Sequence, residues 1–421
     1  MSRHYLTNTF SSLMTIGLAL ACMPSLMRIG NSSVSLTYVY ILLCFTILLF
    51  IVLKDKTMLS FYHYEARKNR MLFISVLMLF FLHVVSVALS DDGLVSRALI
   101  SLIIFITSFL YFSFVFYNDN KFFERFYFFI TIGLLLNLIA ALMQKAGFNL
   151  GTSYYEGHDR FTGLFSNPNQ LSIVVTTTFI FYVDKIETYQ RRVNKILALA
   201  MVGVCFMLLL LAGSKTGIIV SFLIVLCFFV ARKSLTKFIL GIVFLFLALF
   251  LIKESGVLQS VNPRLFDVLS TLSPDTVLEY RTVSSRIELW EYSWKIGTSY
   301  PYLGEGLTST LPEPIRHSHN IVIDYLRMFG PAGLIAILFF IYAIVSYRIY
   351  IPDNSSGNQR AKICKISIIA YLLSNMMSDS MGPQTVFFLA FFASYLAVHS
   401  SMSVSYTNIN KAKLDSDLVA R

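Results

Sequence analysis

The polar residues that could carry chemistry gather in one stretch, residues 281–333, of an otherwise apolar sequence. This stretch contains both tryptophans of the chain, four arginines and two neighbouring histidines, His317 and His319. A guanidinium can bind two phosphate oxygens at once, and an imidazole can accept a proton from a hydroxyl near neutral pH. The stretch therefore predicts a site that binds a phosphorylated compound and activates an alcohol.

The two histidines directly precede a short helix predicted over residues 321–329. A histidine in that position can simply cap the helix or pack against it. It can also remove the proton of a sugar hydroxyl, because the ordinary pKa of a histidine side chain lies near neutrality. We favour His319 as the general base and give His317 a supporting role.

The neighbours of this short helix have structural explanations of their own. Asn320 is of the residue type that favours a helix N-cap, although Ser318 could serve as well. Gly330 can end the helix, and Pro331 can start the next one. Asn320, Gly330 and Gly333 are therefore interpreted as supporting residues that shape the backbone.

Arg286 lies in a segment with apolar or aromatic residues at positions 287, 290 and 294. This helical spacing predicts an amphipathic helix on a membrane surface. Arg286 could pair there with Glu288 or with a lipid headgroup. Its planar guanidinium would also hold two oxygens of a pyrophosphate, which an ammonium cannot do as well. We assign Arg286 to the pyrophosphate and Trp290 to a supporting role.

Two further cations lie in other loops. Lys215 occupies a turn of small residues, 213–217, which would allow close approach to a lipid-linked phosphate. The alternative is a lysine whose ammonium reaches the lipid headgroups. Arg160 precedes the sequence Asn167-Pro168-Asn169, which by itself is typical of a turn and a helix start. Both cations are candidates for binding the same anion.

The elements that must position these residues are transmembrane helices. Of the 421 residues, 56% are hydrophobic and 14% are charged, whereas soluble domains carry about 25% charged residues. The net charge of +11 does not indicate nucleic-acid binding, because the basic residues lie in short loops between apolar segments. The five cysteines lie within apolar runs without paired spacing, which predicts buried apolar residues and no metal site.

Apolar windows predict an all-α polytopic membrane protein with about twelve transmembrane helices. No repeat or linker divides the sequence, so residues 1–421 are expected to form a single membrane domain. Another apolar window follows within seven residues of the first, which is therefore interpreted as a retained helix. The predicted spans are 9–27, 34–53, 71–89, 94–117, 126–143, 168–183, 196–213, 216–231, 236–252, 331–349, 363–379 and 382–399.

The distribution of Lys and Arg predicts how these helices are oriented. Basic residues concentrate in the loops on one side, which places both termini, including the tail 400–421, in the cytoplasm. Residues 144–167 then form an outer loop, and residues 253–330 form a long outer loop with short amphipathic helices. The same orientation brings the positive charges of Arg160, Lys215 and Arg286 to one surface.

At these residues the sequence resembles the bacterial O-antigen ligases and the related polysaccharide polymerases. His319-Asn320, nine residues, Gly330, two residues and Gly333 match the His-Asn-x9-Gly-x-x-Gly pattern of that superfamily. The Arg-x-x-Gly-x-Phe-x-x-Pro-Asn run at 160–169 and Arg-x-x-x-Trp at 286–290 are also typical of it. Lys215 departs from the family, which usually has arginine in that turn, so the bidentate fork is lost there.

The resemblance implies a metal-independent, inverting glycosyltransferase of the integral-membrane type that needs no cofactor. Its donor would be a glycan on undecaprenyl pyrophosphate at the periplasmic face of the bacterial inner membrane. Its acceptor would be a sugar hydroxyl of lipid A–core or of another lipid-linked glycan. By this likeness His319 is the general base and Arg286 holds the pyrophosphate, with residues 253–330 as the periplasmic catalytic loop.

Three functions remain open at this point. An O-antigen ligase would transfer the finished polysaccharide to lipid A–core, and we favour it. A polymerase would use the same donor but transfer to another lipid-linked glycan. A glycolipid flippase or permease is disfavoured, because transporters place ionisable groups within their spans and often show internal repeats. The notable ionisable groups in the predicted spans are His83, Arg97 and Asp379.

Overall fold

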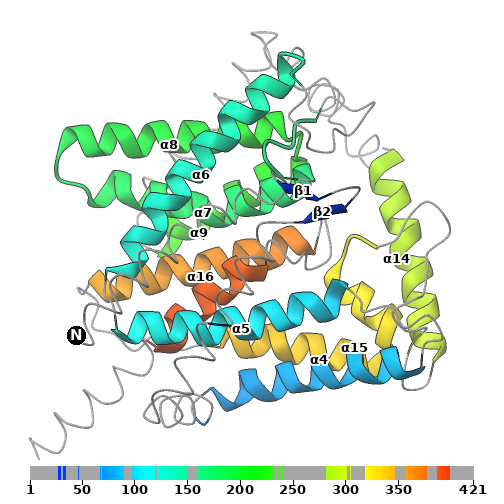
Figure 1. Cartoon of the computed structure of the whole chain (residues 1–421). Helices are drawn as coiled ribbons and strands as arrows, with labels where there is room; N and C mark the ends of the chain where they lie inside the picture. Colours follow the sequence, from blue (N-terminus) through cyan, green and yellow to red (C-terminus); the bar gives the residue numbers. More distant parts are fainter. Residues whose placement is uncertain are drawn as a thin grey trace, which may run out of the picture.

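The structure, a computed structural model, is helical over most of the residues it describes (Figure 1). Its helices are α4 (Arg70–Leu89), α5 (Arg97–Asn118), α6 (Phe122–Lys145), α7 (Pro168–Thr188), α8 (Arg192–Leu211), α9 (Lys215–Ala231), α14 (Arg281–Ser299), α15 (Ile321–Val345), α16 (Ser356–Asn375) and the helix Val386–Val398. The described residues are 27–29, 32–34, 46, 67, 69–89, 97–118, 121–148, 160–165, 167–231, 236, 239, 281–300, 304, 318–346, 356–376 and 386–398.

One small element departs from the all-α prediction. Strands β1 (Met27–Ile29) and β2 (Ser32–Val34) form an antiparallel hairpin in which Ile29 pairs with Ser32. The two intervening residues are Gly30 and Asn31, residue types that two-residue hairpin turns favour. This turn signal lies between two long apolar windows, which dominated the sequence-based interpretation.

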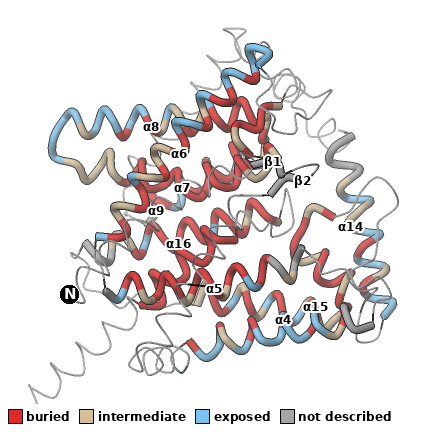
Figure 2. The backbone as a smooth tube through the Cα atoms, viewed as in Figure 1, coloured by how far each residue is buried: buried red, intermediate tan, exposed pale blue. Residues whose placement is uncertain are grey.

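Successive helices α4 to α9 alternate in direction, and α7 and α16 lie inside the bundle (Figures 1 and 2). Nearly every side chain of α7 from Leu171 to Val183 is buried. The outer helices α4 and α8 are different, since Phe81 and Val193 are 65% and 67% exposed. Exposed apolar surface of this extent is what a lipid-facing helix requires. The arrangement is therefore a helical bundle with an apolar exterior.

Three of the described helices, α6, α8 and α15, are long and apolar enough to cross a membrane. Four further apolar helical segments have 10–17 residues, namely Arg70–Ser86, Ser101–Tyr117, Lys215–Phe229 and Val386–Val398. Each of the predicted spans between 71 and 231 and between 331 and 399 overlaps a described helix. The predicted spans 9–27, 34–53 and 236–252 lie almost entirely outside the described residues, so the number twelve stays a prediction.

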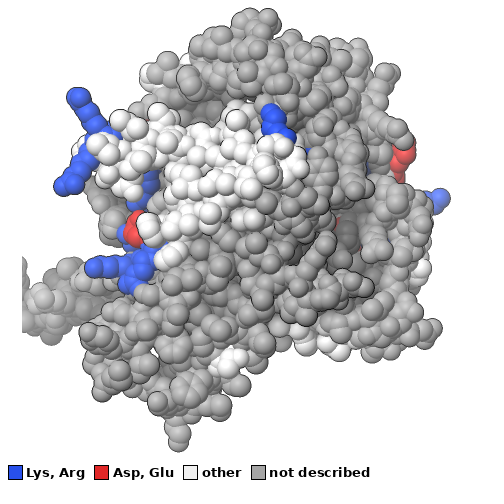
Figure 3. Space-filling view, turned by 45° about the horizontal axis from the view of Figure 1, so that its top comes forward, with Lys and Arg blue, Asp and Glu red and all other residues white. Residues whose placement is uncertain are grey.

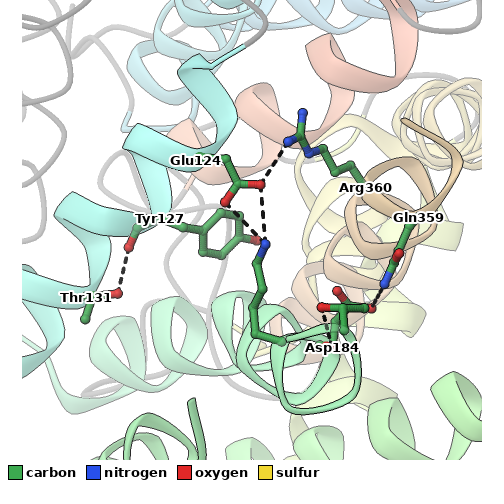
Figure 4. Close-up of polar contacts among 8 residues, drawn as sticks. Glu124, Tyr127, Thr131, Asp184, Gln359 and Arg360 are labelled. Carbon is green, nitrogen blue, oxygen red and sulfur yellow. Dashed lines mark hydrogen bonds and ion pairs between the residues drawn. The ribbon is translucent and has the colours of Figure 1, made fainter. Parts of the chain in front are cut away.

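One end of the bundle is held together by charged side chains from α6, α7 and α16 (Figure 4). Glu124 lies 3.3 Å from Nζ of Lys185 and accepts a hydrogen bond of 3.0 Å from Nη2 of Arg360. The buried carboxylate of Asp184 accepts a hydrogen bond of 2.6 Å from Gln359. Glu124 lies in the first turn of its helix and Lys185 in the last turn of its own, so both charges also suit the helix dipoles.

Lys and Arg side chains gather on the surface at this same end, beside an acidic group (Figure 3). Arg191, Arg192 and Lys195 at the start of α8 are all exposed. This is the end that the distribution of basic residues predicts to face the cytoplasm.

The cysteines divide into two kinds in the described residues. Cys205 and Cys364 are buried with free thiols, as the sequence predicts. Cys227 is also free but exposed, so the prediction of burial is wrong for it. It lies on a helix whose apolar residues are partly exposed, where a small apolar side chain is equally suitable. Cys22 and Cys44 lie outside the described residues.

Candidate functional site

The candidate site residues lie at the end of the bundle opposite the Glu124 network (Figure 1). Lys215 is the first residue of α9, and His319 immediately precedes the N-cap of α15. Arg160 precedes α7, which starts from the same end. Arg286 lies on α14, which packs alongside the first half of α15. The alternation of the helices thus brings these segments to one end of the bundle.

The loop that carries Arg160 is docked onto α6 by two buried amides. Oε1 of Gln144 accepts hydrogen bonds of 3.0 Å from the backbone N–H groups of Thr162 and Gly163. Oδ1 of Asn137 accepts one of 2.9 Å from the N–H of Leu164. Since Asn137 and Gln144 are seven residues apart, they lie on the same face of the helix. The loop is therefore fixed relative to the bundle by side chains rather than by a backbone ladder.

Arg160 itself is held at a defined place beside the turn that contains Lys215. Its Nε donates to the carbonyl of Ala212 at 2.8 Å, and its Nη2 donates to Oδ1 of Asn169 at 2.7 Å. The N–H of Phe161 also donates to the carbonyl of Leu211 at 2.9 Å. The hydrogen bonds to Ala212 and Asn169 orient the guanidinium of Arg160.

The turn before Lys215 is built on Ser214. Its Oγ accepts hydrogen bonds from Oγ of Ser172 at 2.6 Å and from the N–H of Gly217 at 3.1 Å. The second bond satisfies one of the free N–H groups at the start of α9. Lys215 follows as a half-buried residue at the start of that helix. Arg160 and Lys215 thus form one group at the ends of α7, α8 and α9.

The cap and the break of α15 lie where the sequence predicts them. Oδ1 of Asn320 accepts from the N–H groups of Val322 and Ile323 at 3.0 and 3.3 Å, as an N-cap does. Gly330 has φ 63° and ψ −157°, a left-handed conformation that interrupts the helix before Pro331. The chain then turns back so closely that a side chain at Gly333 would overlap the carbonyl of Tyr325.

His319 is held between this cap and a clamp on the preceding residue. Nε1 of Trp290 donates to the carbonyl of Ser318 at 2.8 Å. The N–H of Ser318 donates to Oδ1 of Asp324, also at 2.8 Å. His319 is half-buried and has φ 59°. Trp290 therefore contacts the histidine segment directly, through a hydrogen bond to its backbone.

Arg286 precedes Trp290 by four residues, so the two side chains share a face of α14. Trp290 contacts the histidine segment from that face. The guanidinium is half-buried, and this burial lowers the pKa of Arg286. An anion bound beside it would offset the cost of removing the charge from water. Arg286 and His319 thus lie on two segments that Trp290 joins, and we treat them as a second group.

The remaining predictions fall partly outside the described residues. His317 lies outside them, as do residues 253–280 of the predicted long loop. Sequence reasoning missed Asn137, Gln144 and Asp324, which fix the backbone of the two groups. A signal for the first two is present, because buried amides are costly within an apolar helix and need partners.

Comparisons with known proteins bear on the region that contains most of these residues. The family model described as O-antigen ligase matches residues 197–338, about a third of the chain. The match includes Lys215, Arg286 and His319 but not Arg160. Among curated proteins, no match to the chain is found. The family match and the apolar helices together indicate an integral membrane protein and a glycosyltransferase-like enzyme. Over residues 197–338 the chain is thus similar to the O-antigen ligase family.

Proposed function

We propose that the protein is an O-antigen ligase, which transfers O-antigen polysaccharide from undecaprenyl pyrophosphate to a sugar hydroxyl of lipid A–core. The family match supports transfer of a lipid-linked glycan of this kind. The ligase assignment within that class is our own. The reaction would take place at the periplasmic face of the bacterial inner membrane, where the acceptor lipid and the lipid-linked donor can meet.

In this proposal the cations bind the diphosphate of the donor. Arg286 holds it through the fork of its guanidinium, while Lys215 and Arg160 approach from the ends of α7, α8 and α9. Two neutral hydrogen-bond partners fix the direction of Arg160. Charges fixed in advance stabilise the negative charge that grows on the leaving oxygens, because they need not reorganise during the reaction. No metal ion is required in this scheme.

The chemical step is a displacement at the anomeric carbon of the donor sugar. The acceptor hydroxyl oxygen attacks that carbon and forms the new glycosidic bond, while the bond to the pyrophosphate oxygen breaks. An imidazole nitrogen of His319 takes the hydroxyl proton, and undecaprenyl pyrophosphate leaves with the bonding electrons. Attack opposite the leaving group inverts the anomeric configuration.

One observation carries this proposal. The backbone next to His319 is bonded to Trp290, which shares a helix face with the half-buried Arg286. A proton acceptor and a phosphate-binding group are therefore carried by two helices that are joined directly. The attacking and leaving oxygens are both bonded to one sugar carbon in the transition state. The base and the phosphate-binding group must therefore be held close to each other.

The test is a gel of lipopolysaccharide from a strain that lacks the gene, complemented with the wild type or with His319→Ala. Loss of all ligated O-antigen together with accumulation of the lipid-linked polymer is the expected result. A single repeat that remains attached to core would instead assign the protein as the polymerase. An unchanged gel from the uncomplemented deletion strain would refute both assignments.

A second test, on purified protein, distinguishes an enzyme from a transporter. In detergent, conversion of lipid-linked glycan and lipid A–core to product requires an enzyme, since no membrane remains to be crossed. Absence of any product from a protein that binds both lipids would contradict the proposal.

A further inference from the structure

We propose that Asp324 is a positioning residue for His319, which it holds through the backbone of Ser318. The inference rests on the proposed role of His319 as the base. It concerns a residue that makes no contact with the reacting atoms in the scheme above. The following observations support it.

The backbone N–H and the backbone carbonyl of Ser318 are each hydrogen-bonded to a side chain, one from α15 and one from α14. Its N–H donates to Oδ1 of Asp324 at 2.8 Å, and its carbonyl accepts from Nε1 of Trp290 at 2.8 Å. Ser318 is fully buried, so these side chains replace the water that would otherwise satisfy its backbone. The residue before His319 is consequently fixed at both of its polar backbone groups.

His319 has a backbone conformation that needs such support. Its φ of 59° is left-handed, and among the described residues no other non-glycine residue has a positive φ. A side chain disfavours this region, which persists only where the surroundings enforce it. On the other side, Asn320 caps α15. Its backbone is also held in place, because its N–H donates to Oγ of Ser318 at 3.3 Å. His319 is therefore bracketed by two fixed residues.

Asp324 accepts the hydrogen bond from Ser318 in a buried place, next to a cation. It is 1% exposed, and Oδ1 lies 3.8 Å from Nη2 of the equally buried Arg327, one turn further along α15. Arg327 supplies a countercharge, and the first turn of the helix favours an anion through its dipole. A charged acceptor also makes a stronger hydrogen bond to the Ser318 N–H than a neutral one. The carboxylate thus ties the histidine segment to the first turn of α15.

The decisive comparison is between Asp324→Leu, which removes the acceptor, and Asp324→Asn, which keeps an acceptor oxygen. Misplacing a catalytic group by about 1 Å can cost about 100-fold in rate. We expect Asp324→Leu to lower kcat by about that factor while KM for the lipid-linked donor stays unchanged, since the cations are untouched. Asp324→Asn should recover most of kcat.

Two controls keep the test sharp. Asp324→Leu leaves the charge of Arg327 buried, so Asp324→Leu/Arg327→Met removes both charges and should fold with the same low kcat. Asp184→Asn removes another buried carboxylate at the opposite end of the bundle and should leave kcat unchanged. If neither leucine variant folds, Asp324 is a folding residue and the positioning role is refuted.

The outcomes separate this inference from the proposed function. A His319→Ala variant that still transfers glycan would refute the base and, with it, the reason to position one. Loss of transfer in His319→Ala together with wild-type kcat in Asp324→Leu would overturn the positioning role alone. An equal loss in the Leu and Asn variants, with KM also raised, would assign Asp324 to general structure.

Discussion

The two ends of the helical bundle hold their cations in different ways. At one end, Lys185 and Arg360 both contact the carboxylate of Glu124, which offsets part of their positive charge (Figure 4). At the other end, Arg160 is held by a backbone carbonyl and the side-chain amide of Asn169. A carboxylate partner offsets charge as well as positioning the cation, whereas a carbonyl or an amide oxygen positions a guanidinium through its direction alone.

The two ends are therefore expected to respond differently to substitution. The ion pairs of Glu124 tie helices together, and their removal should affect stability more than activity. At the other end we propose that the cations bind a ligand that brings its own negative charge, so their removal should affect activity. The following variants test that contrast, from the largest expected effect to the smallest.

The largest effect is expected for His319→Ala. Loss of general base catalysis costs about 10²- to 10⁴-fold in rate, so ligated O-antigen should vanish from the gel. Protein level and membrane insertion should persist, because the half-buried ring is not part of the bundle core. Immunoblots of membrane fractions measure the second point. Wild-type glycan profiles in this variant would show that the base has been assigned to the wrong residue.

Arg286→Ala should have a nearly equal effect, since it removes the proposed clamp on the leaving group. Removal of one preorganised group of this kind costs about 10²- to 10³-fold in rate. Arg286→Lys should restore only part of the activity, because an ammonium keeps the charge but loses the fork. Transfer rates of the purified variants provide the comparison. Full activity in both would remove Arg286 from the site.

A smaller effect is expected for Gln144→Leu, which leaves every proposed cation in place. The buried N–H groups of Thr162 and Gly163 would lose their shared acceptor, at a cost of about 1–3 kcal/mol for each unsatisfied group. The loop with Arg160 should detach from α6, and KM for the donor should rise. Gln144→Glu keeps the acceptor oxygen and is the matched control. An unchanged KM in the leucine variant would show that the loop does not contribute to donor binding.

The smallest effect on transfer is expected at the other end, for Glu124→Gln. The ion pairs of Glu124 are partly exposed, and such pairs contribute about 1 kcal/mol or less to stability. Thermal unfolding in detergent should shift slightly downward, while kcat and KM stay as in the wild type. A large loss of activity here would contradict the division between the two ends.

Local residue types were enough to predict several features of this structure. Apolar windows located the helices, Asn320 located the cap, and Gly330 with Pro331 located the break in α15. Each of these depends on residues that are close in sequence, where propensity and hydropathy act directly. The predicted start of α16 was wrong. The helix begins at Ser356, seven residues before the apolar window that starts at 363, because polar residues form its first turns.

The clamps of the candidate site could not be predicted in the same way. Gln144 meets Thr162 and Gly163, and Trp290 meets Ser318, across 18 to 28 residues of sequence. Such pairs depend on how the helices are packed, which no local pattern contains. The left-handed backbone of His319 is also a product of these contacts. The sequence identified residues able to do chemistry, and packing decided how each is held.

The break at Gly330 gives α15 two rigid parts with different surroundings. The longer part, which begins at Pro331, is apolar and would tilt whenever the thickness of the surrounding bilayer changes. The backbone ladder is interrupted at Gly330, but Gly333 lies directly against Tyr325 in the first part. A tilt of the longer part would therefore reach the histidine segment through this contact, so the thickness of the bilayer should influence the alignment of the imidazole.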